Sequence, residues 1–168
     1  MDEMIIKNCN DVVGLDDTLI VLGDVAMGQI DVSLPKVGRI ICKAKMLVGG
    51  NHDRIFSGES PARRERFASA YQEVFDDILP EQTSIRLSNN TLVTLCHFPY
   101  VGDSHEVDRY AGHRPVDDGT ILIHGHTHSH EKVSYSDKGT LMIHVGVDSW
   151  NYRPVSEGEI IDLIEANR

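Results

Sequence analysis

The chain of 168 residues has few cysteines, little positive charge and no long hydrophobic run. Its three cysteines, Cys9, Cys42 and Cys96, are far apart and odd in number. That pattern excludes a disulfide-built scaffold and predicts a reduced, cytoplasmic protein. No apolar stretch has the length that spans a membrane, and the first residues are acidic, unlike the basic start of a secretory signal. We therefore expect no membrane attachment.

Basic residues are outnumbered, with 16 Lys and Arg against 26 Asp and Glu and a net charge of −10. Proteins that bind extended nucleic acid gain affinity when a face rich in Lys and Arg releases counterions. This composition makes such binding unlikely. A small phosphate ester is still a compatible partner if bound cations supply local positive charge.

The remaining composition, 40% hydrophobic and 25% charged, is ordinary for a globular protein, and no composition break divides it. We expect a single domain over 1–168. Helical periods alternate with buried strands early in the chain, and hairpins follow, which predicts an α/β fold. The expected helices are 2–13, 33–42, 60–75 and 156–166, and the expected strands are 18–22, 45–48, 85–87, 92–95, 120–124, 133–135 and 140–145.

Four short motifs carry oxygen or imidazole groups directly after hydrophobic runs. A carboxylate can bridge two cations, and two-metal esterase sites hold their ions roughly 3.5–4 Å apart. Imidazoles suit Mn, Fe, Zn or Ni better than Mg or Ca. If residues 126–128 are extended, their first and last side chains face the same side. The motifs are Gly23-Asp24, Gly50-Asn51-His52-Asp53, Cys96-His97 and Gly125-His126-Thr127-His128.

In this order the motifs resemble motifs two to five of the calcineurin-like metallophosphoesterases, over nearly the whole chain. The resemblance implies two mixed β-sheets packed as a sandwich and flanked by helices. It also implies hydrolysis of a phosphate mono- or diester by a metal-activated water, with one or two divalent transition metal ions. The substrate would be a small phosphate ester.

The resemblance also implies a role for each motif residue. Asp24 would bridge the metal ions and His128 would belong to one metal position, while Asn51, His97 and His126 would complete the other. His52 would hydrogen-bond the phosphate and protonate the leaving oxygen. Asp53 would orient the His52 imidazole.

The family's first motif, Asp-x-His at the end of its first strand, does not occur before Gly23. We therefore expect an N-terminally short domain that lacks the usual first strand. The second metal position would keep only Asp24 and His128 from this chain. Two explanations stay open: Met1 is an internal methionine of a longer natural chain, or the protein lives without that strand. In the second case, the missing strand exposes apolar side chains and unpaired backbone groups. The hypothesis is that the chain forms a homo-oligomer, borrows a strand or places its first helix over the gap.

A long polar loop, 99–118, supplies candidate substrate contacts, because loops of this length in compact domains are often functional. Arg109, His113 and Arg114 are candidates to grip phosphate or sugar oxygens, and Arg153 is a similar one. Ordinary surface charge explains these residues equally well.

The remaining histidines and aromatic residues have less specific interpretations. His124 is expected near the metal ligands without binding metal, and His144 is expected as a hydrogen-bonded core residue. Asp148 either orients a metal-bound histidine or makes a turn. The stripe of Phe67, Tyr71 and Phe75 predicts core packing.

A second function fits the same residues. Without the first motif, the chain could be a catalytically weak metal-binding protein that uses the fold for protein interaction. A purely structural zinc site is disfavoured, because no cysteine pair has the required spacing.

Overall fold

The computed structural model describes residues 1–25 and 27–168, which form two compact units. The N-terminal unit is Met1–Glu81 and the C-terminal unit is Gln82–Arg168. Each unit has one β-sheet of its own. The sequence shows no composition break at the boundary, and the expectation of a single domain stays a prediction. None of the helices in the described residues has the length and apolar character needed to cross a membrane.

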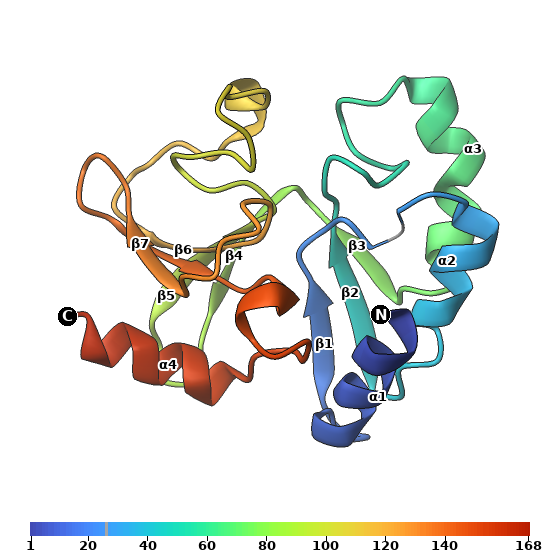
Figure 1. Ribbon diagram of the computed structural model, residues 1–168, viewed down its shortest axis with the longest axis horizontal. Helices are drawn as coiled ribbons and strands as arrows, with labels where there is room; N and C mark the ends of the chain where they lie inside the picture. Colours follow the sequence, from blue (N-terminus) through green and yellow to red (C-terminus); the bar gives the residue numbers. More distant parts are fainter. Residues whose placement is uncertain (26) are drawn as a thin grey trace. The chain divides into compact units, whose positions relative to one another are not determined.

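The N-terminal unit is built around a parallel three-stranded sheet of order β1-β2-β3 (Figure 1). Its helices connect strands that run in the same direction, so the carboxyl ends of β1 and β2 lie at one edge. Its elements are α1 (Asp2–Val12), β1 (Thr18–Val21), α2 (Ile30–Val37), β2 (Ala44–Val48), α3 (Pro61–Gln72) and β3 (Asp77–Leu79).

Two apolar clusters hold this unit together. Ile30 and Leu34 from α2 are one turn apart and pack with Leu47 of β2 and the aromatic residues of α3. A smaller cluster joins Ile6 and Cys9 of α1 to Ile40. The second cluster explains why α2 ends before the predicted residue 42. Gly38 is a poor helix former, and the chain then turns so that Ile40 packs under α1.

The strand β3 was not predicted from the sequence. It has only three residues and begins with a charged side chain, so its apolar signal is short. It pairs in parallel with β2 from Met46 to Val48. The helix start at Ser60 is confirmed, since the Ser60 hydroxyl accepts a hydrogen bond from the Arg63 amide and Pro61 is the first helical residue.

The C-terminal unit contains a mixed five-stranded sheet of order β4-β5-β6-β8-β7. The strands β5, β6 and β8 run parallel, and the two predicted antiparallel pairs, β4 with β5 and β7 with β8, are confirmed. The α/β class with two sheets is confirmed, but only this second sheet is mixed. Its elements are β4 (Gln82–Arg86), β5 (Leu92–Cys96), η1 (Ala111–His113), β6 (Ile121–His124), β7 (Val133–Tyr135), β8 (Leu141–His144), η2 (Val147–Ser149) and α4 (Glu157–Ala166).

The start of α4 is fixed by a capping box and an ion pair. The Ser156 hydroxyl accepts from the Glu159 amide, and the Glu159 carboxylate accepts from the Ser156 amide. The Arg153 guanidinium donates to both oxygens of Glu159, at 2.6 and 2.9 Å. Arg153 was a candidate for substrate contact. These contacts give its guanidinium the role of anchoring the helix start, and its contact with substrate stays a prediction.

We expect the Arg153–Glu159 ion pair to make the free energy of unfolding depend on pH. Hydrogen bonds from Arg153, and then from the Ser156 amide, lower the pKa of Glu159 from 4.5 to about 2. The pair therefore stabilises the fold fully above pH 4.5, and this contribution is lost as the pH falls toward 2. Since Glu159 is one-third exposed, solvent screening limits the expected loss in Glu159→Gln to about 0.5–1 kcal/mol at pH 6.

Urea unfolding at pH 6 and pH 3 measures this effect. The difference in unfolding free energy between the wild type and Glu159→Gln should be about half as large at pH 3 as at pH 6. Glu165→Gln, on the same helix, is the matched control and should leave stability unchanged at both values. An equal difference at the two pH values would contradict the prediction.

Candidate metal centre

In the N-terminal unit, the motif residues lie at the carboxyl edge of the parallel sheet. Gly23-Asp24 follows β1, and residues 50–53 follow the neighbouring strand β2. Gly23 and Asp24 both have left-handed backbones, with φ of +84° and +55°. That conformation costs free energy at a residue with a side chain and is found most often at functional sites.

Asp53 joins the two loops of this edge. Its side chain is fully buried, and its Oδ2 accepts from the amides of Asp24 at 2.8 Å and Gly50 at 2.9 Å. Its Oδ1 accepts from the Val25 amide and the Tyr71 hydroxyl, each at 3.2 Å. These contacts hold the two loops together, and the role of Asp53 in orienting the His52 ring stays a prediction.

A second hydrogen bond links the same loops in the opposite direction. The His52 amide donates to Asp24 Oδ1 at 2.9 Å, while the His52 side chain is exposed. Asn51, next to it, is half-buried. Burial raises the pKa of Asp53, and the nearby Asp24 charge adds to this, whereas the Gly50 and Asp24 amides oppose it. The loops are therefore joined around Asp24 by hydrogen bonds in both directions.

Tyr71 has a role that the sequence did not reveal. It is buried in α3, and Phe75, which lies beyond the end of this helix at Gln72, is buried in the same cluster. The prediction of core packing for this stripe is confirmed, but the predicted helix end at residue 75 is wrong. The Tyr71 hydroxyl also accepts from the Arg54 amide at 3.0 Å while donating to Asp53. A tyrosine in a buried stripe usually has a partner for its hydroxyl, and that was the available signal.

In the C-terminal unit, two predicted ligands are brought together by parallel strands. His97 follows β5 and His126 follows β6, and the Gly125 amide donates to the His97 carbonyl. Both side chains are buried, and His97 Nε2 lies 3.3 Å from His126 Nδ1. Two nitrogens bound tetrahedrally to one metal ion at about 2.0–2.1 Å lie about 3.3 Å apart. The 3.3 Å spacing of this pair, which is also a hydrogen-bond distance, is therefore compatible with two ligands of one transition metal ion.

The expectation that residues 126–128 are extended is wrong. His126 and His128 have left-handed backbones, with φ of +66° and +50°. Consequently His126 is buried, whereas the His128 side chain is 68% exposed. His128 Nδ1 lies 3.1 Å from Asp148 Oδ2, so Asp148, in η2, does orient this candidate ligand.

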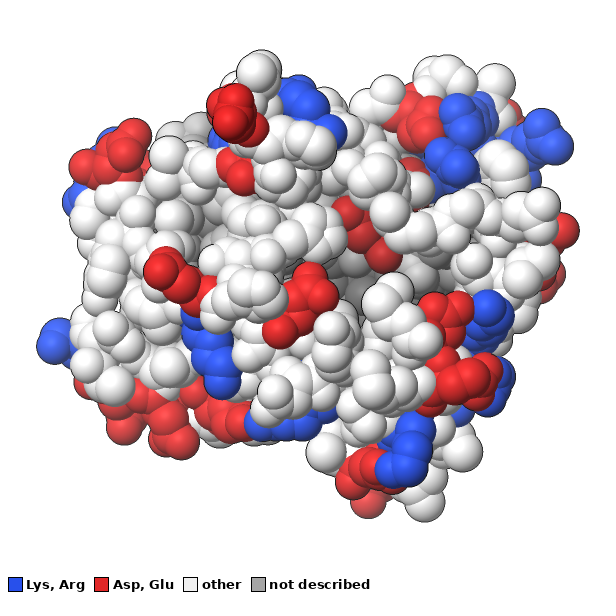
Figure 2. Space-filling model, in the orientation of Figure 1, with Lys and Arg blue, Asp and Glu red and all other residues white. Residues whose placement is uncertain are grey.

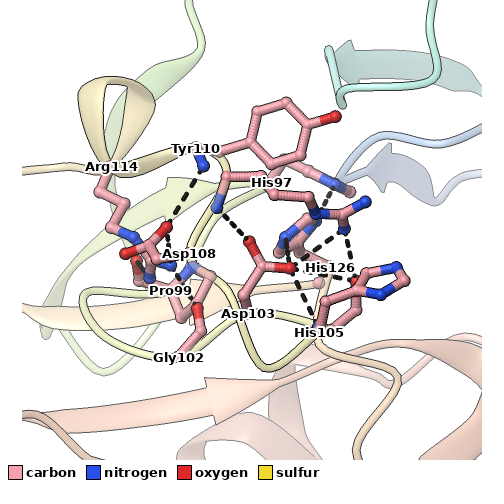
Figure 3. Close-up of polar contacts among 12 residues, drawn as sticks. His97, Pro99, Gly102, Asp103, His105, Asp108, Tyr110, Arg114 and His126 are labelled. Atoms are coloured by element: carbon pink, nitrogen blue, oxygen red, sulfur yellow. Dashed lines mark hydrogen bonds and ion pairs between the residues drawn. The ribbon is translucent and has the colours of Figure 1, made fainter.

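Asp103, which the sequence did not single out, lies beside His126 (Figure 3). Its Oδ1 is 3.4 Å from His126 Nε2, and both side chains are only 2% exposed. Burial alone would raise the pKa of Asp103, but hydrogen bonds from the Arg109 amide and guanidinium and the contact with His126 lower it well below its usual range. Asp103 therefore stays ionised. An acidic residue within a long loop after a candidate ligand was the only signal in the sequence.

The loop 99–118 uses its arginines internally. Arg114 donates to the carbonyls of Pro99 and Gly102 and to Asp108, with its side chain only 8% exposed (Figure 3). Arg109 donates to Asp103 and Ser104. The Arg114 guanidinium holds the loop closed, and its assignment to substrate binding stays a prediction. Arg109, more exposed, keeps that assignment as a prediction.

The other predicted loop and core histidines are also placed. His113 lies in η1, and the centroids of the His113 and Phe98 rings are 6.0 Å apart. His144 is buried and hydrogen-bonded through Nδ1 to the Ser149 hydroxyl at 2.9 Å, as expected for a core residue. His124 is buried beside it, with Nδ1 2.8 Å from the Gly125 carbonyl. Burial lowers the pKa of His124 to about 3 and that of His144 to about 4.

The family model that describes a calcineurin-like phosphoesterase superfamily domain matches residues 4–155. The chain belongs to this superfamily. It is 39% identical over 175 residues to the Gene 66 protein of Mycobacterium phage L5, covering 97% of this chain and 80% of that protein. The Gene 66 protein of Mycobacterium phage D29 is 36% identical over 149 residues, and this alignment covers 83% of this chain and 71% of the D29 protein.

A solved structure has a similar fold. The crystal structure of a protein of unknown function from Aquifex aeolicus aligns with a TM-score of 0.68 and 25% identity. The alignment covers 96% of this chain and 84% of the Aquifex chain. Membership of the calcineurin-like superfamily supports phosphate-ester hydrolysis and divalent-metal binding in general terms. That the five candidate ligands Asp24, Asn51, His97, His126 and His128 share one pocket stays a prediction.

Proposed function

We propose that this protein is a metal-dependent phosphoesterase that hydrolyses a small phosphate mono- or diester. The observation that carries the proposal is the buried pair of His97 and His126, whose nitrogens are spaced as two ligands of one metal ion. Superfamily membership supplies the reaction class.

The donor set consists of imidazoles and oxygens. His97, His126 and His128 supply nitrogen, and Asp24 and Asn51 supply oxygen, which favours Mn, Fe, Zn or Ni. When bound, one or two such ions supply an activated water and neutralise negative charge that develops on the phosphate.

The chain's own residues prepare and assist this chemistry. The contacts of Asp53 fix the backbone of Asp24 and Gly50, so the oxygen ligands need little reorganisation. His52 has its amide fixed by Asp24 and its ring in solvent, where it can reach a phosphate. In the proposed reaction, His52 hydrogen-bonds the phosphate and gives a proton to the leaving oxygen.

The charge of the protein favours a small substrate. Acidic and basic side chains are interspersed on the face shown in Figure 2, without an extended basic surface there. With a net charge of −10, the chain gains little from counterion release on a long polyanion. A single phosphate group that meets bound cations avoids this repulsion.

Metal removal tests the proposal. Hydrolysis of p-nitrophenyl phosphate and bis-p-nitrophenyl phosphate by the full chain should fall at least about 100-fold after chelation and return with Mn²⁺. His126→Ala should lose metal and activity together, while His130→Ala, an exposed histidine of the same unit, should change neither. Metal binding without hydrolysis of either ester, under Mn, Fe, Zn and Ni in turn, would instead favour the catalytically weak interaction protein.

A further inference from the structure

We propose that Asp103 is a positioning residue that orients His126 for metal binding. The inference rests on the proposed function, in which His126 is a metal ligand. It assigns a task to the segment 102–109, which folds around the Asp103 carboxylate (Figure 3).

The two ring nitrogens of His126 face different partners. Nδ1 lies 3.3 Å from His97 Nε2, and Nε2 lies 3.4 Å from Asp103 Oδ1. A neutral imidazole carries one N–H and one lone pair, and an ionised carboxylate only accepts. At 3.4 Å the contact is an ion-pair distance, longer than an ordinary hydrogen bond. The negative charge of Asp103 beside Nε2 still favours the proton on that nitrogen and leaves the Nδ1 lone pair directed to the side of His97. Metal-bound histidines are commonly oriented by a carboxylate in this way.

The surroundings hold both groups in this arrangement. Asp103 Oδ1 accepts from the His105 amide and the Arg109 guanidinium, and Oδ2 accepts from the Arg109 amide, all at 3.1 Å. These bonds prevent the carboxylate from turning away. The Tyr110 ring stands edge-on to the His126 ring, with centroids 5.5 Å apart and planes at 90°. Burial of both side chains strengthens the electrostatic contact, because the local dielectric is low.

A purely structural role for Asp103 makes a different prediction. In that case its loss would loosen the loop without changing the His126 tautomer or the metal affinity. Asp108 provides the matched control, because it accepts from Arg114 and the Tyr110 amide within the same loop. Asp103→Asn keeps the side-chain shape but removes the charge.

The experiment measures Mn²⁺ binding to the full chain by calorimetry, with the metal alone as the probe. We expect Asp103→Asn to weaken Mn²⁺ affinity about 10–100-fold. Asp108→Asn should stay within about twofold of the wild type, because Asp108 lies in the same loop but its hydrogen bonds are to Arg114 and the Tyr110 amide and not to His126. Long-range ¹H–¹⁵N NMR of the metal-free chain should show His126 protonated on Nε2 in the wild type and in Asp108→Asn, and a mixture of tautomers in Asp103→Asn.

Several results would overturn the inference. They are unchanged affinity in Asp103→Asn, an equal loss in Asp108→Asn, a wild type that binds no metal, or an Nδ1-protonated His126. If the wild type hydrolyses phosphate esters but Asp103→Asn binds Mn²⁺ normally, only this inference fails. If Asp103→Asn binds Mn²⁺ weakly but the wild type hydrolyses neither ester, only the proposed function fails.

Discussion

Replacing His52 by alanine is expected to lower phosphate-ester turnover by about 10²–10⁴-fold while the bound metal stays unchanged. The residue has an exposed ring on a loop whose backbone is already fixed, so its removal should not disturb the ligands. A group that donates a proton to the leaving oxygen acts mainly in the transition state, so kcat should fall more than KM rises.

Steady-state kinetics and metal analysis of the same preparations check this expectation. His105→Ala removes another exposed histidine and should keep wild-type turnover. Loss of metal in His52→Ala would show that His52 is a ligand. Full activity would remove it from the reaction altogether.

Removing the Asp53 carboxylate is expected to be the most destabilising single change in the N-terminal unit. In Asp53→Ala, three amides and the Tyr71 hydroxyl lose their acceptor, which is itself fully buried, and the bonds of Gly50 and Tyr71 are buried as well. Each buried donor left unsatisfied costs about 1–3 kcal/mol, so a loss of about 3 kcal/mol or more in unfolding free energy is expected. Asp53→Asn should be nearly as harmful, because its NH₂ group would face backbone N–H donors.

Urea unfolding of three variants measures this loss. Tyr71→Phe removes one hydroxyl from the same network and should cost only about 1–2 kcal/mol. If the unfolding free energy of Asp53→Ala lies within about 1 kcal/mol of the wild-type value, the Asp53 carboxylate does not hold these loops together. Metal titration of the variants would then show whether the loop arrangement around Asp24 survives without it.

Local patterns were enough to locate most of the elements. The helix start at Ser60-Pro61, the hairpin of β4 and β5, and the pairing of β7 with β8 all follow from capping chemistry and period-two alternation. The three-residue strand β3 and the early end of α2 were missed. In both cases packing between distant segments outweighs a weak local preference.

The candidate ligands were readable because strand ends carry them. A buried run followed by Gly-Asp, Gly-Asn-His-Asp or Gly-His-Thr-His places polar groups at a sheet edge whatever the rest of the chain does. The residues that contact and support these motif residues could not be predicted in this way. Asp103 reaches His126 from 23 positions earlier in the chain, and Tyr71 reaches Asp53 from 18 positions later.

The order of residues along the chain was enough to predict the superfamily, because its motifs are short and contiguous, and the superfamily supports phosphate-ester hydrolysis and divalent-metal binding in general terms. Only the folded structure shows which charged side chains are bound by acceptors of the protein itself. Arg114 and Arg153 look like surface cations in the sequence, yet loop and helix acceptors already bind them. The hydrogen bonds by which Asp53 joins two loops were likewise visible only in the folded structure. Hydrogen-bond partners far apart in the chain are fixed by three-dimensional geometry, which no local spacing encodes.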